Sequence, residues 1–476
     1  MPDEPIKTRF APSPSGFLHL GNVRTALFNW LYARHCKGVF LLRIEDTDEA
    51  RTSEAAVNAL IEDLHWLALS WDEGQGGGGT AGPYRQSERG AIYQEYFSKL
   101  ESAGLAYPCF CSPPQLSLAR KQQLARGLAP RYAGTCRHLS PAEVQRRRAA
   151  GGASSLRFHV EPGRSLEFAD RVRGPQRFAT DDIGDFVIRR SDGSPAFFFS
   201  NVLDDALMGV TDVLRGEDHL SNTPRQLLIL AALGLPGPRY AHIGLVTDAD
   251  GSPLSKRAGS LAVRELRAQG VLPIAVHNTL GRLGHRYEEP GFLGPDALIA
   301  RFDIRRIGRA PARFDPVQLK HWQREAVAQL EPKAFWDWLS AGTRRTVPET
   351  ARDAFIEAIR TNVSLPGETG AWAGILFDDA MLIAADAEAA IAAAGPEFFQ
   401  HALQALAAAP EQFDHFLAAL KQASGKKGPR LFAPLRAAIT GRMDGPELKT
   451  LIPLIGPARL AQRLAAAQHL QHAEHL

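Results

Sequence analysis

Apolar and polar positions follow two different periods at the start of the chain. Residues 6–11 form a short apolar run that predicts a buried strand, and the prolines and glycine of residues 12–16 end it. Apolar residues then recur at helical spacing over residues 22–34, and residues 39–44 predict the next strand. A strand, a loop, a helix and a second strand in this order are typical of a parallel nucleotide-binding sheet.

The pattern changes twice further along the chain. Residues 107–190 mix a cysteine and histidine cluster with a strand-like segment at 155–160, and buried strands and helices return after Phe197, at residues 210–214 and 225–233. From about Trp322 the chain is rich in alanine, as in residues 384–394. Because alanine is the strongest helix former, we expect an all-helical C-terminal region.

Composition and charge narrow the class of protein only slightly. A chain of 476 residues is too long for one core, and four cysteines in it do not form a disulfide framework. Neither a signal peptide nor a membrane-spanning run is recognisable, so we expect a cytoplasmic protein without membrane contact. The net charge is only +3, but basic residues gather at 120–148, 301–324 and 421–442. These stretches could track a phosphate backbone or form solvated helix faces.

Two separated segments predict phosphate handling. His19-Leu20-Gly21-Asn22 lies where a strand gives way to a helix, a place that favours phosphate, and glycine there lets a nucleotide approach the backbone. Leu254-Ser255-Lys256-Arg257 lies in a glycine-flanked loop that could close over a triphosphate. The catalytic candidates are His19, Lys256 and Arg257, and the ATP-binding candidates are Gly21, Asn22, Leu254, Ser255 and Lys256. Taken alone, the first segment could be a helix cap and the second an ordinary surface loop.

Three thiols and an imidazole predict a metal site. Cys109 and Cys111 are separated by 24 residues from Cys136, and His138 follows two positions later. Two pairs of soft ligands at the ends of a basic helical hairpin suit one structural Zn²⁺ ion with closed tetrahedral coordination. The alternative is a set of buried thiols beside an exposed histidine.

Several spaced segments together resemble one family. Residues 9–22 with 24–27 resemble the signature that opens the class I glutamyl-tRNA synthetases, and further segments match that family in the same order. These further segments are residues 43–48, 82–89, 204–205, 209–219 and 254–257. They cover about the first two thirds of the chain, and agreement of so many spaced segments by chance is hard to credit.

The resemblance implies an α/β fold with several domains. We expect a class I Rossmann-type parallel-sheet catalytic domain, an inserted acceptor-stem domain that carries the zinc site, and an all-α anticodon-binding region. The implied boundaries are residues 1–106 and 191–240 for the catalytic domain, 107–190 for the insertion, 241–321 for a stem-contact domain with the Leu254–Arg257 loop, and 322–476 for the helical region.

The resemblance also implies a glutamate pocket. Its residues would be Arg9, Ser13, Glu45, Phe197, Asn201 and Arg215. Arginine offers the substrate's side-chain carboxylate a planar, two-pronged partner, and Glu45 would take the substrate ammonium. Without the family context, Arg9 and Arg215 could be structural salt bridges. Three positions depart from the usual patterns: Phe197 replaces an aromatic hydroxyl, and Asn22 and Pro253 replace a histidine and a lysine of the general class I motifs.

The expected activity is ATP-dependent attachment of L-glutamate to tRNA(Glu), through glutamyl-adenylate and with Mg²⁺ accompanying ATP. We expect a monomer. The family implies an arginine that rejects tRNA(Gln), and alignment of residues 359–362 places Asn362 there, so mischarging of tRNA(Gln) is a further hypothesis. The alternatives are a glutaminyl-tRNA synthetase, whose C-terminal half would be β-barrels, and a catalytically silent tRNA-binding or regulatory paralogue. A truncated base-modifying paralogue is disfavoured because it would lack the helical region.

Overall fold

The computed structural model of the chain describes residues 5–14, 16–48, 52–248, 250–252, 254, 262–410 and 412–470. The chain divides into two compact units. Unit 1 comprises Met1–Glu265 and Val276–Pro316, and unit 2 comprises Leu266–Ala275 and Val317–Leu476. Each unit is described below by itself.

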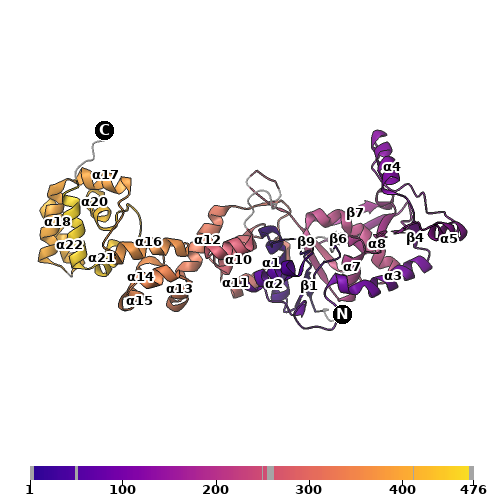
Figure 1. The fold of residues 1–476 in the computed structure, drawn as a ribbon, viewed down its shortest axis with the longest axis horizontal. Helices are drawn as coiled ribbons and strands as arrows, with labels where there is room; N and C mark the ends of the chain where they lie inside the picture. The colour runs from indigo at the N-terminus through magenta and orange to yellow at the C-terminus, as the bar shows by residue number, and fades with distance from the viewer. Residues whose placement is uncertain are drawn as a thin grey trace. The chain divides into compact units, whose positions relative to one another are not determined.

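A parallel sheet forms the centre of unit 1 (Figure 1). Strands β1 (Lys7–Phe10), β2 (Val39–Leu42) and β3 (Glu73–Gly74) pair in parallel, and so do β9 (Asp212–Gly216) and β10 (Arg239–Ile243). The backbone N–H of Thr211 donates to the carbonyl of Lys7 at 2.9 Å, which places the start of β9 beside β1. This arrangement is a nucleotide-binding sheet and confirms the predicted fold class.

Helix α1 (Leu20–His35) is the first crossover of this sheet. It packs against β1, β2 and β9 and also against α11 (Pro295–Ala300), so apolar side chains on most of its circumference are buried. The predicted helix at 22–34 lies inside α1, and the predicted strands at 6–11 and 39–44 correspond to β1 and β2. The first part of the fold is therefore as the periodicity indicates.

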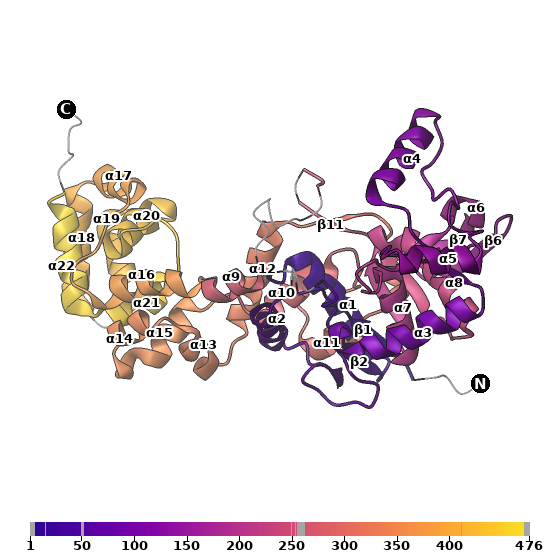
Figure 2. The same ribbon diagram turned by 45° about the vertical axis from the view of Figure 1, so that its right-hand side comes forward.

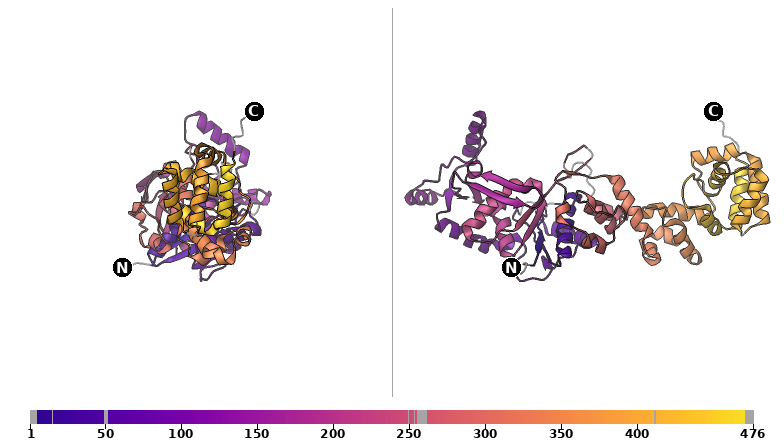
Figure 3. Two further views of the ribbon diagram at one scale, coloured as in Figure 1. Left: turned by 90° about the vertical axis from the view of Figure 1, so that its left-hand side faces the viewer. Right: turned by 180° about the vertical axis from the view of Figure 1, so that it is seen from behind.

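Between β3 and β9 the chain forms a second, antiparallel sheet and a hairpin. Strands β4 (Ala106–Cys109), β5 (Ser155–Phe158) and β8 (Phe186–Arg189) form the sheet in the order β4-β5-β8. Strands β6 (Ser165–Asp170) and β7 (Gly174–Ala179) form the hairpin, and β6 also contacts β10. The right panel of Figure 3 shows the paired strands of unit 1.

One helix, not the predicted helical hairpin, joins the two predicted ligand pairs, Cys109/Cys111 and Cys136/His138. Helix α4 (Pro113–Ala125) projects from the rest of unit 1 in Figure 2, and the chain returns to Cys136 without a second helix. Gly127 adopts a positive φ of 70° just past α4, and Pro130 follows it. Both residues end helices, which explains the difference from the prediction. Helix α5 (Pro141–Ala149) begins only after the second pair.

Helix α7 (Phe197–Leu207) presents two adjacent carboxylates to the interior of unit 1. Asp204 accepts hydrogen bonds from Gln86 Nε2 at 2.8 Å, from Arg89 Nε at 2.7 Å and from the hydroxyl of Tyr93 at 2.8 Å. Arg89 and Asp204 are both almost completely buried. A buried ion pair with this many partners holds α7 against the segment that leads into α3 (Gly90–Ser102).

The described residues of unit 2 beyond 316 form helices and no strands. They enclose one apolar core, and the left panel of Figure 3 shows the C-terminal helices, in orange to yellow, side by side. Helix α17 (Ala385–Ala394) corresponds to the predicted alanine-rich helix. The expectation of an all-helical C-terminal region is confirmed for this part of the chain. Among the described residues, no helix is both long and apolar enough to cross a membrane.

The remaining elements complete the two units. Those within unit 1 are α2 (Glu54–Trp66), η2 (Gln86–Arg89), α6 (Thr180–Ile183), η3 (Glu217–Asn222), α8 (Thr223–Leu233), β11 (Val246–Thr247), η4 (Ile304–Arg306) and β12 (Ala312–Arg313). Helices α9 (Val263–Gln269), α10 (Pro273–Arg282) and α12 (Pro316–Ala328) contribute residues to both units. Those within unit 2 are α13 (Pro332–Trp338), α14 (Ala341–Thr346), η5 (Glu349–Ala351), α15 (Arg352–Ile359), α16 (Pro366–Phe377), α18 (Pro396–Ala408), α19 (Phe413–Ser424), α20 (Pro429–Thr440), α21 (Leu448–Ile455) and α22 (Pro457–Gln468).

Removal of the Asp204 carboxylate should strongly destabilise unit 1. We predict that Asp204→Ala lowers the free energy of unfolding by about 3–5 kcal/mol, because Arg89 is left as a buried charge without its counter-ion. Glu95→Ala breaks the exposed ion pair with Lys99 and should change that free energy by less than about 1 kcal/mol. Urea titration followed by tryptophan fluorescence measures both variants, and equal losses would contradict the prediction.

Candidate active site

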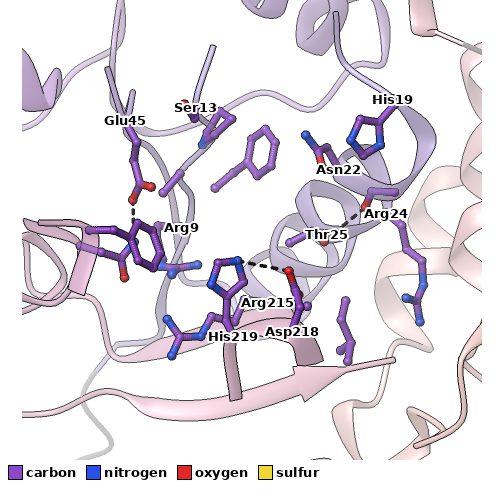
Figure 4. Close-up of a pocket in the computed structure, with 18 of the residues that line it drawn as sticks. Arg9, Ser13, His19, Asn22, Arg24, Thr25, Glu45, Arg215, Asp218 and His219 are labelled. Carbon is purple, nitrogen blue, oxygen red and sulfur yellow. Dashed lines mark hydrogen bonds and ion pairs between the residues drawn. The ribbon is translucent and has the colours of Figure 1, made fainter. Parts of the chain in front are cut away.

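A cavity of about 560 Å³ lies at the carboxyl ends of β1, β2, β9 and β10. Ligands of open parallel sheets bind at this edge, where loops replace the strands. In Figure 4, Glu45 and Arg9 lie on one side of the cavity, and His19 and Asn22 lie on the other. The cavity therefore has two chemically different ends.

Most of the predicted site residues line this single cavity. They are Arg9, Ser13, His19, Gly21, Asn22, Glu45, Phe197, Asn201, Arg215 and Leu254. Ser255, Lys256 and Arg257 lie outside the described residues, as does Pro253. The backbone N–H of Leu254 donates to the carbonyl of Val246 at 3.0 Å, so the described start of the second motif is anchored at the cavity wall.

His19 and Gly21 shape the end of the cavity at the start of α1. His19 precedes the helix with an extended backbone (φ −107°, ψ 161°), and its side chain makes no hydrogen bond that caps the helix. A Cβ atom on residue 21 would lie 3.3 Å from two atoms of the His19 ring. Glycine at this position therefore lets the imidazole lie close over the first turn of the helix, where backbone N–H groups favour an anion.

Arg24 connects α1 to the cavity wall at Gly244, which follows β10. Its Nε donates to the carbonyl of Leu283 at 2.6 Å, and its Nη1 donates to the carbonyl of Gly244 at 2.7 Å. The guanidinium also lies over the ring of Phe28, and burial lowers its pKa to about 10. The cavity wall at Gly244 and the helix that follows His19 are thus held together by one side chain.

Acidic and basic groups are paired at the other end of the cavity. Asp205 Oδ1 accepts from Arg9 Nε at 3.2 Å and from Arg43 Nη1 at 2.8 Å. Burial alone would raise the pKa of Asp205, but the two arginines outweigh it and lower that pKa. Arg9 therefore makes the salt bridge that was considered as an alternative role, and it also lines the cavity.

Glu45 lies beside the Asp205 ion pairs, and its own pKa is raised. Its Oε1 accepts from Asn201 Nδ2 at 2.5 Å and from Arg43 Nη2 at 3.3 Å. Burial raises the pKa of Glu45, and these two partners offset the effect only in part. A further cation beside this carboxylate, such as a substrate ammonium group, would stabilise its charged form.

Arg215 is held by neutral groups. Its Nε donates to His242 Nε2 at 3.1 Å, and its Nη2 donates to Thr223 Oγ1 at 2.9 Å and to Gln226 Oε1 at 2.7 Å. None of these hydrogen bonds goes to a carboxylate, so the salt-bridge alternative does not describe Arg215. Burial lowers its pKa to about 10, which leaves it charged near neutral pH.

Two cavity residues follow β9, within the family-like segment 209–219, and the sequence assigned no role to them. Asp218 and His219 both line the cavity, and Figure 4 shows them beside each other at its floor. The His219 ring packs against Phe197 with 5.4 Å between ring centroids. Burial, followed by the nearby Arg215, lowers the pKa of His219 to about 4, so its imidazole is neutral. Their position just after a sheet strand was the signal that could have identified them.

The three cysteines form a cluster, and His138 does not belong to it. The sulfur atoms of Cys109, Cys111 and Cys136 all lie within 4.8 Å of one another. The hydroxyl of Tyr132 lies 3.3 Å from Cys109 Sγ and 3.5 Å from Cys111 Sγ, and it accepts from the backbone N–H of Cys136 at 2.9 Å. His138 is exposed. The structure thus brings together three of the four predicted ligands and adds a phenol that the sequence pattern did not single out.

Thiolate formation is favoured within this cluster. Burial opposes ionisation of Cys109, but hydrogen bonds from Tyr132 and Arg157 outweigh burial and lower the pKa of this thiol to about 7. The Arg157 guanidinium lies 3.8 Å from the centre of the Tyr132 ring. Thiolates are the form in which cysteine binds Zn²⁺, so the donor set fits that metal.

Family models match nearly the whole chain. The model of the catalytic domain of class I tRNA synthetases (E and Q) matches residues 5–321. The model of an anticodon binding domain matches residues 325–468. The second match falls on the helices of unit 2.

Curated relatives and solved structures agree with these models. Glutamate–tRNA ligase 2 of Nitrosococcus oceani is 59% identical over 96% of this chain and 97% of its own length. Glutamate–tRNA ligase 1 of Methylococcus capsulatus is 55% identical over 97% and 98%. The crystal structure of glutamate–tRNA synthetase from Elizabethkingia anophelis superposes with a TM-score of 0.85 at 27% identity and covers 98% of this chain and 99% of its own. The chain therefore belongs to the glutamate–tRNA ligases, within the class I tRNA synthetase family for E and Q.

Proposed function

We propose that this protein attaches L-glutamate to tRNA(Glu) in an ATP-dependent reaction, with Mg²⁺ accompanying ATP. One observation carries the proposal: a single cavity holds two arginines and a carboxylate at one end and the start of α1 at the other. The first end suits an amino acid with two carboxylates and an ammonium group, and the second suits phosphate. All residues that line the cavity belong to unit 1, which supports a site that works in a monomer.

The glutamate-binding residues have distinct roles in this proposal. Arg215 and Arg9 attract the carboxylates, and Glu45 takes the ammonium. Ser13 lines the same end, and Asn201 orients Glu45 through the hydrogen bond between Asn201 Nδ2 and Glu45 Oε1. Phe197 contributes apolar surface in place of a hydroxyl, which removes one hydrogen bond worth about 0.5–1.5 kcal/mol.

Two steps follow from this placement. The α-carboxylate of glutamate attacks the α-phosphorus of ATP in line, and pyrophosphate leaves with the bonding electron pair. A terminal ribose hydroxyl of tRNA then attacks the acyl carbon of the adenylate, loses its proton and displaces AMP. No enzyme nucleophile is required, so catalysis rests on orientation and charge stabilisation. In this proposal His19, Gly21 and Asn22 bind the phosphates at the start of α1. The second motif, Leu254, Ser255, Lys256 and Arg257, is assigned to the same phosphates on the family resemblance, and only its Leu254 lies among the described residues. Mg²⁺ neutralises charge on the triphosphate.

A second hypothesis concerns the choice of tRNA. Asn362 is exposed just beyond the end of α15, where the family implies an arginine that rejects tRNA(Gln). The neighbouring Arg360 is engaged, because its Nη1 donates to the carbonyl of Leu330 and its Nη2 pairs with Glu357. We therefore propose that the protein also charges tRNA(Gln) with glutamate. The glutaminyl-tRNA synthetase alternative is disfavoured, since the described residues of unit 2 form helices where that enzyme would have β-barrels.

Aminoacylation of both tRNA species with labelled glutamate and labelled glutamine tests these proposals together. We expect glutamate, and not glutamine, to be attached to tRNA(Glu) and also to tRNA(Gln). Strict preference for tRNA(Glu) would remove the second hypothesis and leave the first intact. If folded protein attached neither amino acid and gave no glutamate-dependent exchange of pyrophosphate into ATP with tRNA present, the silent paralogue would replace the enzyme.

The pKa of Glu45 predicts how glutamate binding depends on pH. Because this pKa is raised, Glu45 takes up a proton at a higher pH than an exposed glutamate, whose pKa is about 4.3. A protonated Glu45 no longer attracts the substrate ammonium, so KM for glutamate should rise as the pH is lowered. Glu45→Gln should raise KM above this pKa, where the wild-type Glu45 is charged, and should flatten the dependence. KM for ATP, measured in parallel, is the control, and identical pH profiles of the variant and the wild type would contradict the role of Glu45.

We also propose that one structural Zn²⁺ ion per chain is held by Cys109, Cys111 and Cys136. The Tyr132 oxygen is the better placed fourth ligand, because it lies beside all three cysteines, whereas the exposed His138 would have to turn toward them. The ion would close the end of the segment that carries α4 and has no part in the reaction steps.

Metal analysis of the purified protein should find about one zinc per chain. Loss of zinc to a chelator, followed with a colorimetric indicator, should be faster in Tyr132→Phe than in the wild type, because the variant loses an oxygen ligand and keeps the ring. His138→Ala should release zinc at the wild-type rate. The reverse order of the two variants would assign the fourth position to His138, and absence of zinc would remove the proposed site.

A further inference from the structure

The buried charge of Arg215 is left without a counter-ion in contact with it. Only 4% of this residue is exposed, and its hydrogen bonds go to an imidazole, a hydroxyl and an amide oxygen. Its Nη1 has no hydrogen-bond partner among the residues that the structure describes. Arg9 differs, because Asp205 pairs with it directly. A buried cation held by neutral groups retains its attraction for an anion that enters the cavity.

His242 on β10 makes this arrangement possible. Its Nε2 lies 3.1 Å from Arg215 Nε and 3.1 Å from Thr223 Oγ1. Since a guanidinium nitrogen only donates, Nε2 must offer a lone pair, and the ring proton is then on Nδ1. Nδ1 lies 2.6 Å from Asp170 Oδ2 and donates to it. The His242 ring is completely buried, so a neutral imidazole with this one tautomer faces Arg215.

Asp170, which sets the tautomer, belongs to the β6–β7 hairpin. It is the last residue of β6, and its carboxylate accepts from the backbone N–H groups of Val172, Arg173 and His242 at 2.7–3.2 Å. These contacts fix the carboxylate on the far side of the imidazole from Arg215. The negative charge therefore orients His242 without touching the guanidinium.

We infer that His242 and Asp170 are positioning residues that make the site select a negatively charged substrate side chain over its neutral amide. Asp170 holds the tautomer of His242, and His242 aims Arg215 at the cavity while leaving its charge available. A carboxylate neutralises that charge and an amide does not, so glutamate is preferred over glutamine. This inference rests on the proposed function and assigns the origin of its amino-acid specificity.

Two substitutions at one position separate this role from a structural one. In His242→Gln the amide group reaches the place of Nε2 and can accept from Arg215, whereas in His242→Asn it reaches only the place of Nδ1 and faces Asp170. We expect His242→Asn to raise KM for glutamate about tenfold or more, because a hydrogen bond to a charged group is lost. His242→Gln should stay within about threefold of the wild type. KM for ATP should be unchanged in both variants.

The ratio of kcat/KM for glutamate to kcat/KM for glutamine is the second readout. It should fall in His242→Asn and recover in His242→Gln. Equal glutamate KM values for the two variants, or a parallel rise of KM for ATP, would overturn the inference while the wild type still charged tRNA with glutamate. If the wild type did not, the proposed function would fail and the inference with it. Should His242→Asn not fold, Asp170→Asn, which disturbs the same tautomer, is measured instead against His242→Gln with the same criteria.

Discussion

Buried charge is the constraint on which the architecture of unit 1 depends, and α7 meets it with two adjacent residues. Asp204 satisfies Arg89, Gln86 and Tyr93, which hold the chain that leads into α3. Asp205 satisfies Arg9 and Arg43, which belong to the ends of β1 and β2. One helix therefore stabilises the fold with one carboxylate and arranges the cavity with the next. Loss of either carboxylate would leave a buried arginine without the counter-ion that it pairs with here.

The cavity itself follows from strand direction. Parallel strands bring their carboxyl ends to one edge, so residues that are far apart in the chain meet there without any local interaction between them. Glu45 follows β2, and Arg215 lies near the carboxyl end of β9. Neighbouring side chains then determine how these groups behave: Asn201 on α7 orients Glu45, and His242, which lies opposite Arg215 on β10, orients Arg215.

The sequence predicted the elements that show a periodic apolar pattern and the site residues that lie in family-like segments. Helical spacing located α1, apolar runs located β1 and β2, and the family-like segments located Arg9, Glu45 and Arg215. It did not predict Asp170 or His242, because their contact spans 72 positions and each residue alone has many ordinary roles. Tyr132 was missed for a similar reason, since phenols are common and only the folded loop brings this one beside the thiols. The predicted helical hairpin at the cysteines is wrong, because Gly127 and Pro130 end the helical conformation after α4.

The place of Asp170 in the chain has a consequence for protein engineering. Its hairpin belongs to the segment between β4 and β8, whereas its partner His242 lies on β10, which follows this segment in the chain. The segment between β4 and β8 is therefore not an independent module. A chimera that takes this segment from a related enzyme replaces Asp170 but not His242, and so replaces one member of a buried contact pair. Such a chimera keeps a working amino-acid pocket only if its residues at both positions still fit each other.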